Sequence, residues 1–247
     1  MVKKKNLKKL LNLNFVDLTN QTYSIGRYDL PYFRCPANIT IDYLALYSEV
    51  RNYNKTDNTC VCFYQYDINF DNMKGIFNAI YYNDAKLLAK YKERFKNVKY
   101  AIAPDYSQLG DIHRAENIYR LFKARIVSVW LVLECNVLVI PNITYANENY
   151  FDVMLDGTKD TEVVAFNVKG SMRESEEKVM LSKAIKITID ELPKLKKIIV
   201  YSVSIDDEKV LKLFEYASLK GIEIVVPDNI LKERNIANKE VKSDGKK

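Results

Sequence analysis

The sequence predicts an α/β protein built on a mostly parallel sheet. From residue 60 onward, six short apolar segments rich in β-branched residues alternate with longer stretches of helical periodicity. The short segments are apolar on both faces, which is typical of strands buried between layers of helices. Because a parallel neighbour can be reached only through a long crossover, this alternation favours parallel over antiparallel pairing.

The predicted strands are separated by amphipathic helices. The strands are expected at residues 60–66, 100–103, 137–140, 162–168, 197–203 and 222–226. The helices are expected at residues 84–95, 111–134, 174–192 and 206–220, where apolar side chains recur at helical spacing. Asp111 and Asp206 are the expected N-terminal caps of two helices, and Gly221 suits the position just after the last one.

Six strand–helix units fit two arrangements of the sheet. A barrel-like fold of the TIM type, complete or incomplete, is favoured slightly over an open doubly wound sheet. The first 59 residues are less regular. Residues 39–50 are predicted to form a helix, and Pro31 and Pro36 interrupt the chain before it.

The whole chain, residues 1–247, is predicted to be one α/β domain with short basic tails at residues 1–11 and 236–247. Its 247 residues, 48% of them apolar, can bury one sizeable core, and only 7 Gly and 6 Pro leave little material for a flexible linker. The formal charge of +6 is concentrated in the lysines near the two ends. Solubility explains these lysines more simply than a nucleic-acid arm does, but the tails keep nucleic acid as a candidate partner.

Cysteine usage and hydropathy indicate a cytoplasmic protein. No secretory leader is recognised, so Cys35, Cys60, Cys62 and Cys135 are expected to be reduced thiols. Cys60 and Cys62 lie two apart and would share one face of a strand, which favours core packing over a four-thiolate zinc site. The longest apolar stretch, residues 126–141, is interrupted by polar residues and is too short to cross a bilayer, so no membrane association is expected.

Polar side chains follow each predicted strand. The carboxyl ends of parallel strands lie on one edge of a sheet, so we expect these side chains to converge there. Asp67 and Asp105 are the candidate catalytic acids because each follows a buried strand closely, and Pro104 stiffens the backbone before Asp105. The candidate ligand-binding residues are Tyr106, Ser107, Asn142, Lys169, Ser171 and Tyr201.

Each of these residues also has a local structural explanation. Asp and Asn after a strand are common helix caps and turn formers, which is the more frequent role for such residues taken singly. The turn at Lys169, Gly170 and Ser171 would offer backbone amides and one positive charge to an anion. The chain has no G-x-G-x-x-G, P-loop or G-x-S-x-G motif and a single histidine, His113, so the common dinucleotide, P-loop and hydrolase-triad sites are disfavoured.

Several short motifs together resemble one known family. Residues 61–71 read VCFYQYDINFD, residues 103–107 read APDYS, residues 139–142 read VIPN, and residues 163–170 and 199–201 supply a strand ending near glycine and an IVY element. In this combination the chain resembles the uncharacterised bacterial and phage family called domain of unknown function 4417, across roughly residues 30–227. Ser202 stands where glycine often follows the tyrosine in that family.

The resemblance implies no established activity. The occurrence of the family on phages and other mobile elements implies a cytosolic protein tied to replication, host takeover or defence. This is an association rather than a mechanism, because function resides in a site and not in a fold.

Two functional hypotheses follow, and the sequence leaves open whether the protein is an enzyme. The first is a ligand-binding or active site at the carboxyl edge of the sheet, with a nucleotide or another phosphorylated compound as ligand and Mg²⁺ held by the acids as a candidate cofactor. The second is a non-catalytic interaction protein that contacts DNA through its lysine tails, or a host protein through an exposed aromatic surface.

Overall fold

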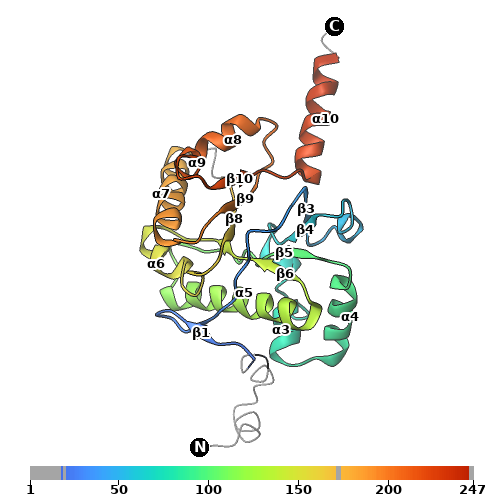
Figure 1. The fold of residues 1–247 in the computed structure, drawn as a ribbon. Coiled ribbons are helices and arrows are strands. Elements are labelled where there is room, and N and C mark those ends of the chain that lie inside the picture. The colour runs from blue at the N-terminus through green and yellow to red at the C-terminus, as the bar shows by residue number, and fades with distance from the viewer. Residues whose placement is uncertain (1–17, 19–20, 171–173, 245–247) are drawn as a thin grey trace, which may run out of the picture.

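Two parallel sheets form the centre of the molecule. The computed structural model describes residue 18 and residues 21–170 and 174–244. Within them the chain forms two four-stranded parallel sheets and one short antiparallel pair. Figure 1 shows the strands of the two large sheets near the centre, with helices packed around them. The predicted α/β class with parallel strands is confirmed.

The first sheet takes its strands in the order of the sequence. They are β3 (Tyr43–Leu46), β4 (Thr59–Cys62), β5 (Tyr100–Ile102) and β6 (Leu138–Ile140). Side chains from its outer face pack with those of three helices, α3 (Ile76–Tyr81), α4 (Ala85–Phe95) and α5 (Arg114–Cys135). Helix α4 begins after Asp84, whose carboxylate accepts hydrogen bonds from two N–H groups of the first turn.

The second sheet is formed by the next four strands along the chain. They are β7 (Asn142–Ile143), β8 (Val163–Asn167), β9 (Lys197–Tyr201) and β10 (Glu223–Val225). Its outer apolar cluster includes α6 (Phe151–Met154), α7 (Ser175–Glu191), α8 (Asp207–Leu213) and α9 (Glu215–Leu219). Asp206 caps α8 as predicted, and Gly221 follows α9 with a φ of +74°, a left-handed conformation that glycine adopts without strain.

A single segment, residues 138–143, connects the two sheets. Strand β6 pairs with β5, and β7, which begins two residues after β6 ends, pairs with β8. The Ile140 carbonyl accepts a hydrogen bond from the Ala103 N–H at 2.9 Å, and the Pro141 carbonyl accepts one from the Ala165 N–H at 2.8 Å. Pro141 has no N–H to donate, so it suits the position where the strand changes its partner.

The far edges of the two sheets meet at one isolated bridge. Tyr43 of β3 forms a parallel bridge with Asp228, which follows β10. The Leu44 N–H donates a hydrogen bond to the Asp228 carbonyl at 2.8 Å. The described strands form two separate sheets and no closed barrel, so neither the barrel-like arrangement nor the count of six units is confirmed.

The two sheets share an apolar layer that lies between them. Cys60, Ile102 and Ile140 of the first sheet and Ala165 and Ile199 of the second belong to one cluster, and each is 0% exposed. The alternate residues of the same strands face the helices instead. Because side chains alternate along a strand, every central strand is buried on both faces, which explains its uninterrupted apolar sequence.

The cysteines serve packing in two different places. Cys60 and Cys62 share one face of β4, as predicted, and lie in the shared layer with Cys35. Cys135 ends α5 and packs against the outer cluster of the first sheet, so the four thiols do not come together. All four cysteines are free, and burial raises the pKa of the Cys35 thiol to about 12.

All six predicted strands are present, each of them shorter than expected, but one helix prediction is wrong. Residues 39–50 contain strand β3 instead of a helix. Tyr43 and Ala45 face the outer cluster while Leu44 and Leu46 face the shared layer, so the segment shows no polar face that would reveal its period. The cap assigned to Asp111 is also wrong, because α5 begins at Arg114 after His113.

The remaining elements attach at the periphery. Short helical turns form η1 (Val50–Asn52), η2 (Asp67–Asn69) and η3 (Glu148–Tyr150). The hairpin of β1 (Ser24–Ile25) and β2 (Leu30–Pro31) is held by Asp156, whose carboxylate accepts hydrogen bonds from the N–H groups of Arg27 and Tyr28 at 2.8 and 3.1 Å. These contacts join the start of the described chain to the end of α6.

The last helix, α10 (Ile230–Asp244), extends away from the body of the molecule (Figure 1). Buried Lys232 anchors its first turn, with its Nζ 2.8 Å from an Asp207 carboxylate oxygen and 3.0 Å from one of Asp228.

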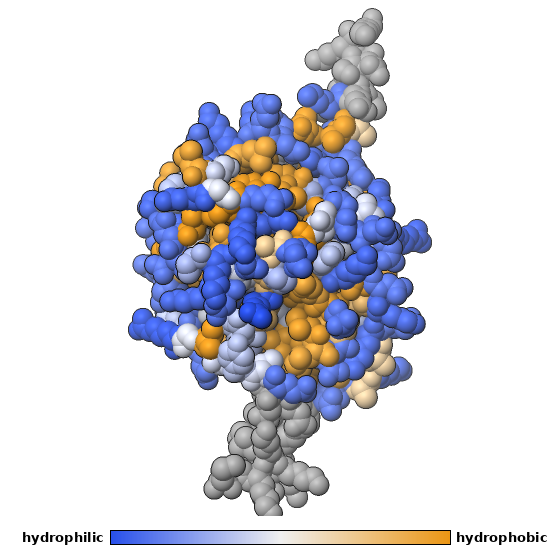
Figure 2. Space-filling view, in the orientation of Figure 1, coloured by the Kyte–Doolittle hydropathy of each residue, from blue (hydrophilic) through white to orange (hydrophobic). Residues whose placement is uncertain are grey.

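Figure 2 shows a mostly hydrophilic face, with hydrophobic side chains in one area near α8 and another near α5. In the described part of the chain, no helix combines the length and the apolar character that crossing a membrane requires.

The shared layer predicts a clear difference between two isoleucine truncations. Ile102 is 0% exposed between the sheets, whereas Ile68 in η2 is 68% exposed. We expect Ile102→Ala to lower the free energy of unfolding by about 2–5 kcal/mol, because it leaves a cavity in the layer. Ile68→Ala should change it by no more than about 0.5 kcal/mol. Urea denaturation of both variants measures the difference, and equal effects would show that Ile102 is not in a packed layer.

Candidate functional site

The candidate site is centred on the carboxylate of Asp105, which lies where the two sheets meet. Asn142 of β7 donates a hydrogen bond from its side-chain amide to one Asp105 oxygen at 2.8 Å. Asn167, the last residue of β8, donates one to the other oxygen at 3.3 Å. The loop after β5 thus supplies the acid, and the second sheet supplies both amides.

Two further hydrogen bonds fix the orientation of these amides. The Tyr64 hydroxyl donates to the Asn142 side-chain oxygen at 2.8 Å, and the Lys169 backbone N–H donates to the Asn167 side-chain oxygen at 3.0 Å. Each amide oxygen is therefore occupied, so each amide nitrogen must point at Asp105. The result is a connected polar network rather than a set of independent contacts.

Burial controls the acidity of Asp105. Removal of the carboxylate from water raises its pKa above the ordinary aspartate value, and the hydrogen bonds from Asn167, Asn142 and Thr144 oppose this rise. The nearby negative charge of Asp67 adds to it. The residue as a whole is half-buried.

A buried aromatic pair belongs to this network. The rings of Tyr64 and Tyr201 lie 4.8 Å apart between centroids, and both residues are buried. The Tyr201 hydroxyl has no hydrogen-bond partner among the described residues. Burial raises the pKa of both phenols, so both remain protonated donors at neutral pH.

Asp67, the other predicted acid, lies in a different set of contacts. Its carboxylate accepts hydrogen bonds from the backbone N–H and the hydroxyl of Ser107, the latter at 3.0 Å. It also forms an ion pair with Arg120 of α5, with a separation of 2.9 Å. Asp71 and Lys123 form a second ion pair between the same loop and the same helix. These contacts fasten the loop after β4 to α5 and hold the loop that carries Ser107.

Tyr106 points away from Asp105, although it is the next residue. It is 1% exposed and packs in the outer cluster, edge-on to Phe70 with ring centroids 5.2 Å apart. The Nζ of Lys123 lies 4.4 Å from the centre of its ring. The structure therefore places Tyr106 and Asp105 on opposite sides of the strand end, as alternation requires.

The turn after β8 lies beside the network through Asn167. Lys169 is exposed, and its ammonium group has no ion-pair partner among the residues described. Gly170 has a φ of +100° and no atom within 4 Å of the position a Cβ would take. Ser171 lies outside the described residues, as do the lysines of residues 1–11, while the tail predicted at residues 236–247 belongs largely to α10.

Sequence reasoning missed two residues of the network, Tyr64 and Asn167. Both fall inside the predicted strands, 60–66 and 162–168, and not in the turns that follow them. Alternation contains the signal: Tyr64 follows Cys60 and Cys62 on the inner face of its strand, and Asn167 follows Ala165 in the same way. A polar residue at the end of an inner face is therefore a better marker of this site than a polar residue in the following turn.

The two predicted acids are not arranged as a Mg²⁺ site. The oxygens of Asp67 accept hydrogen bonds from Arg120 and Ser107, and those of Asp105 accept them from two side-chain amides. Across residues 21–170 and 174–244, no group of three or more His, Cys, Asp or Glu side chains is placed to hold a metal ion.

Comparison with known families gives one match. The family described as Domain of unknown function (DUF4417) matches residues 22–217, which include every residue of the network. No curated protein matches the chain.

A charge placed at Asn142 tests the geometry of the network. Asn142→Asp sets a second carboxylate beside that of Asp105, so we expect the pKa of the pair to rise in the folded protein. The folded variant then binds more protons than the unfolded variant. Its free energy of unfolding is therefore highest at about pH 4 and falls as the pH rises through the raised pKa. We expect a loss of about 2 kcal/mol between pH 4 and pH 7 relative to the wild type.

Urea denaturation across this pH range measures the loss, and Asn147→Asp is the matched control. Asn147 accepts a hydrogen bond from the Asn149 N–H at the start of η3, and an aspartate side chain can accept the same bond. The control should keep the wild-type pH dependence. The arrangement of Asn142 and Asp105 described above would be wrong if the two variants had the same pH profile.

Proposed function

This chain belongs to the domain family DUF4417, and we propose that it binds a small phosphorylated ligand at the carboxyl ends of its strands, with Asp105 facing the ligand. A nucleotide is the preferred ligand. The observation that carries this proposal is the Asp105 carboxylate, held between the two sheets by amides of Asn142 and Asn167.

The surroundings of Asp105 favour contact with a neutral hydrogen-bond donor. Its described hydrogen-bond partners, Asn142, Asn167 and Thr144, are all neutral, in contrast to the ion pair that Asp67 forms with Arg120. A carboxylate with a raised pKa is a suitable acceptor for the hydroxyl or amino group of a ligand and exchanges a proton with it more readily at neutral pH. The ribose and base of a nucleotide carry such groups.

The turn after β8 is the candidate site for the phosphate. Lys169 offers a positive charge that has no ion-pair partner among the described residues, and the open space around Gly170 allows close approach to the backbone. Asn167 links this turn to Asp105, because its amide bonds both the Lys169 N–H and the carboxylate. A ligand with an anionic end and a hydrogen-bond donor several bonds away fits this pair of features.

The proposal includes a barrel-like relation between the two sheets. The strand change at Pro141, the shared apolar layer and the bridge between Tyr43 and Asp228 support it. In such an arrangement the carboxyl ends of the strands surround one opening of the barrel, and Asp105 lies beside that opening.

Calorimetric titration with the nucleoside monophosphates AMP, GMP, CMP and UMP tests the proposed function. We expect at least one to bind, and Asp105→Asn to weaken its binding by about tenfold or more through loss of a charged acceptor. Lys169→Gln should weaken binding of the nucleotide but not binding of the corresponding nucleoside, which has no phosphate. Asp67→Asn is the matched control and should leave the affinity within about twofold.

Two results would contradict this proposal. One is the absence of binding of all four nucleotides by the folded wild-type protein. The other is a loss of binding in Asp67→Asn with none in Asp105→Asn, which would place the ligand at Asp67 instead of Asp105. Thermal unfolding of each variant shows that it is folded before the titration is interpreted.

A further inference from the structure

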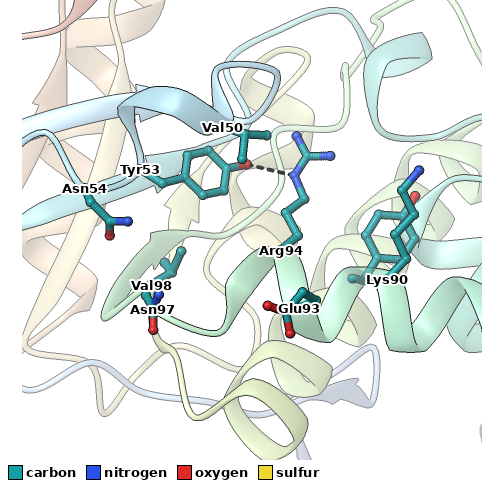
Figure 3. Close-up of a pocket in the computed structure, with 9 residues that line it drawn as sticks. Val50, Tyr53, Asn54, Lys90, Glu93, Arg94, Asn97 and Val98 are labelled. Carbon is teal, nitrogen blue, oxygen red and sulfur yellow. Dashed lines mark hydrogen bonds between the residues drawn. The ribbon is translucent and has the colours of Figure 1, made fainter.

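A cavity lies away from the strand ends, between η1 and α4. It has a volume of about 650 Å³, within the range of sites that hold small molecules. Val50, Val98 and the ring of Tyr53 give it an apolar wall. Figure 3 shows the Lys90 and Arg94 side chains extending from α4 beside this space, with Asn54 and Asn97 on the other side.

Within the part of the chain that the structure describes, no carboxylate forms an ion pair with Arg94. Its Nε donates a hydrogen bond to the Tyr53 hydroxyl at 3.2 Å, and a terminal nitrogen donates to the Tyr47 carbonyl. The guanidinium carbon lies 3.8 Å from the centre of the Tyr47 ring. These partners are all neutral, so they orient the half-buried guanidinium without cancelling its charge.

The other charges lining the cavity leave it positive. Lys90 lies one turn before Arg94 on α4, is exposed and forms no ion pair within the described chain. The one acid that lines the cavity, Glu93, is exposed, and its carboxylate lies 3.7 Å from the Nζ of Lys96. Two cations and one acid thus border an apolar space, and neither cation pairs with a carboxylate of the described residues.

Three other cations that are half-buried or buried contact a carboxylate. Arg120 pairs with Asp67, Lys123 with Asp71, and Lys232 with both Asp207 and Asp228. Pairing is the usual condition for a charge that loses contact with water. Arg125, which is 3% exposed, instead donates to the Asp156 carbonyl, so neutral partners alone can hold a buried cation here. Arg94 differs because it lines a cavity, where its charge and that of Lys90 can meet an external anion.

We infer that this cavity binds a small amphipathic carboxylate. Its head group would lie between Lys90 and Arg94, and its hydrocarbon body would lie against Val50, Tyr53 and Val98. The stacked Arg94 is preorganised for a carboxylate, because its side chain is already held in one orientation. The site is separate from that of Asp105, so either can fail without the other.

Calorimetric titration of the full chain with three probes tests the ligand class. Decanoate has both a negative head and an apolar body, decylamine has the body with the opposite charge, and acetate has the head alone. We expect decanoate to bind at least about tenfold more tightly than either of the others. Equal binding of decanoate and decylamine would overturn the inference, as would equal binding of decanoate and acetate.

Variants of the cavity locate the binding. Lys90→Gln should weaken the binding of decanoate by about fivefold. Lys86→Gln removes the same charge from an exposed position one turn earlier on α4, outside the cavity, and should have no effect. Val50→Asp places a negative charge at a residue that is 49% exposed, so the protein should fold and lose decanoate binding. Equal losses in Lys90→Gln and Lys86→Gln, or unchanged binding in Val50→Asp, would place the ligand elsewhere and overturn the inference.

Discussion

The structure depends on one short segment that belongs to both sheets. Residues 138–143 pair with β5 before Pro141 and with β8 after it. Because the carbonyls of Ile140 and Pro141 accept hydrogen bonds from opposite neighbours, the two sheets are joined through the main chain. Their inner faces must then pack on each other, and the shared layer of fully buried side chains follows from that constraint.

The same segment positions the candidate site. Asn142 follows Pro141 directly, so its side chain lies at the joint, between the end of β5 and the end of β8. Asp105 reaches this point from one side and Asn167 from the other. Two carboxylates at adjacent strand ends thereby acquire different surroundings, since an ion pair holds Asp67 and neutral amides hold Asp105. Such a difference in environment is how proteins give similar acids different roles.

The sequence contains enough information for the strands and for their common direction, but not for which side chains meet. Apolar runs separated by helical stretches predicted six of the seven strands from β4 onward, all except the two-residue β7, and the expected convergence of strand ends agrees with the contact between Asp105 and Asn142. Strand β3 was missed because Tyr43, Leu44, Ala45 and Leu46 are all buried, and a run without a polar face shows neither a helical nor a strand period. Tyr106 follows the same strand end as Asp105, which predicts a shared site, but the alternation of side chains turns it into the outer cluster instead.

The titration of the Asp105 side chain tests most directly whether this carboxyl group is withdrawn from water between the sheets. Carbon-13 NMR of the labelled carboxyl groups, with Asp105→Asn identifying the resonance, gives its pKa in the folded protein. We predict a pKa above the ordinary aspartate value of about 3.9. A pKa at or below that value would mean that the group is solvated or paired with a cation, and the site described around Asp105 would then be wrong.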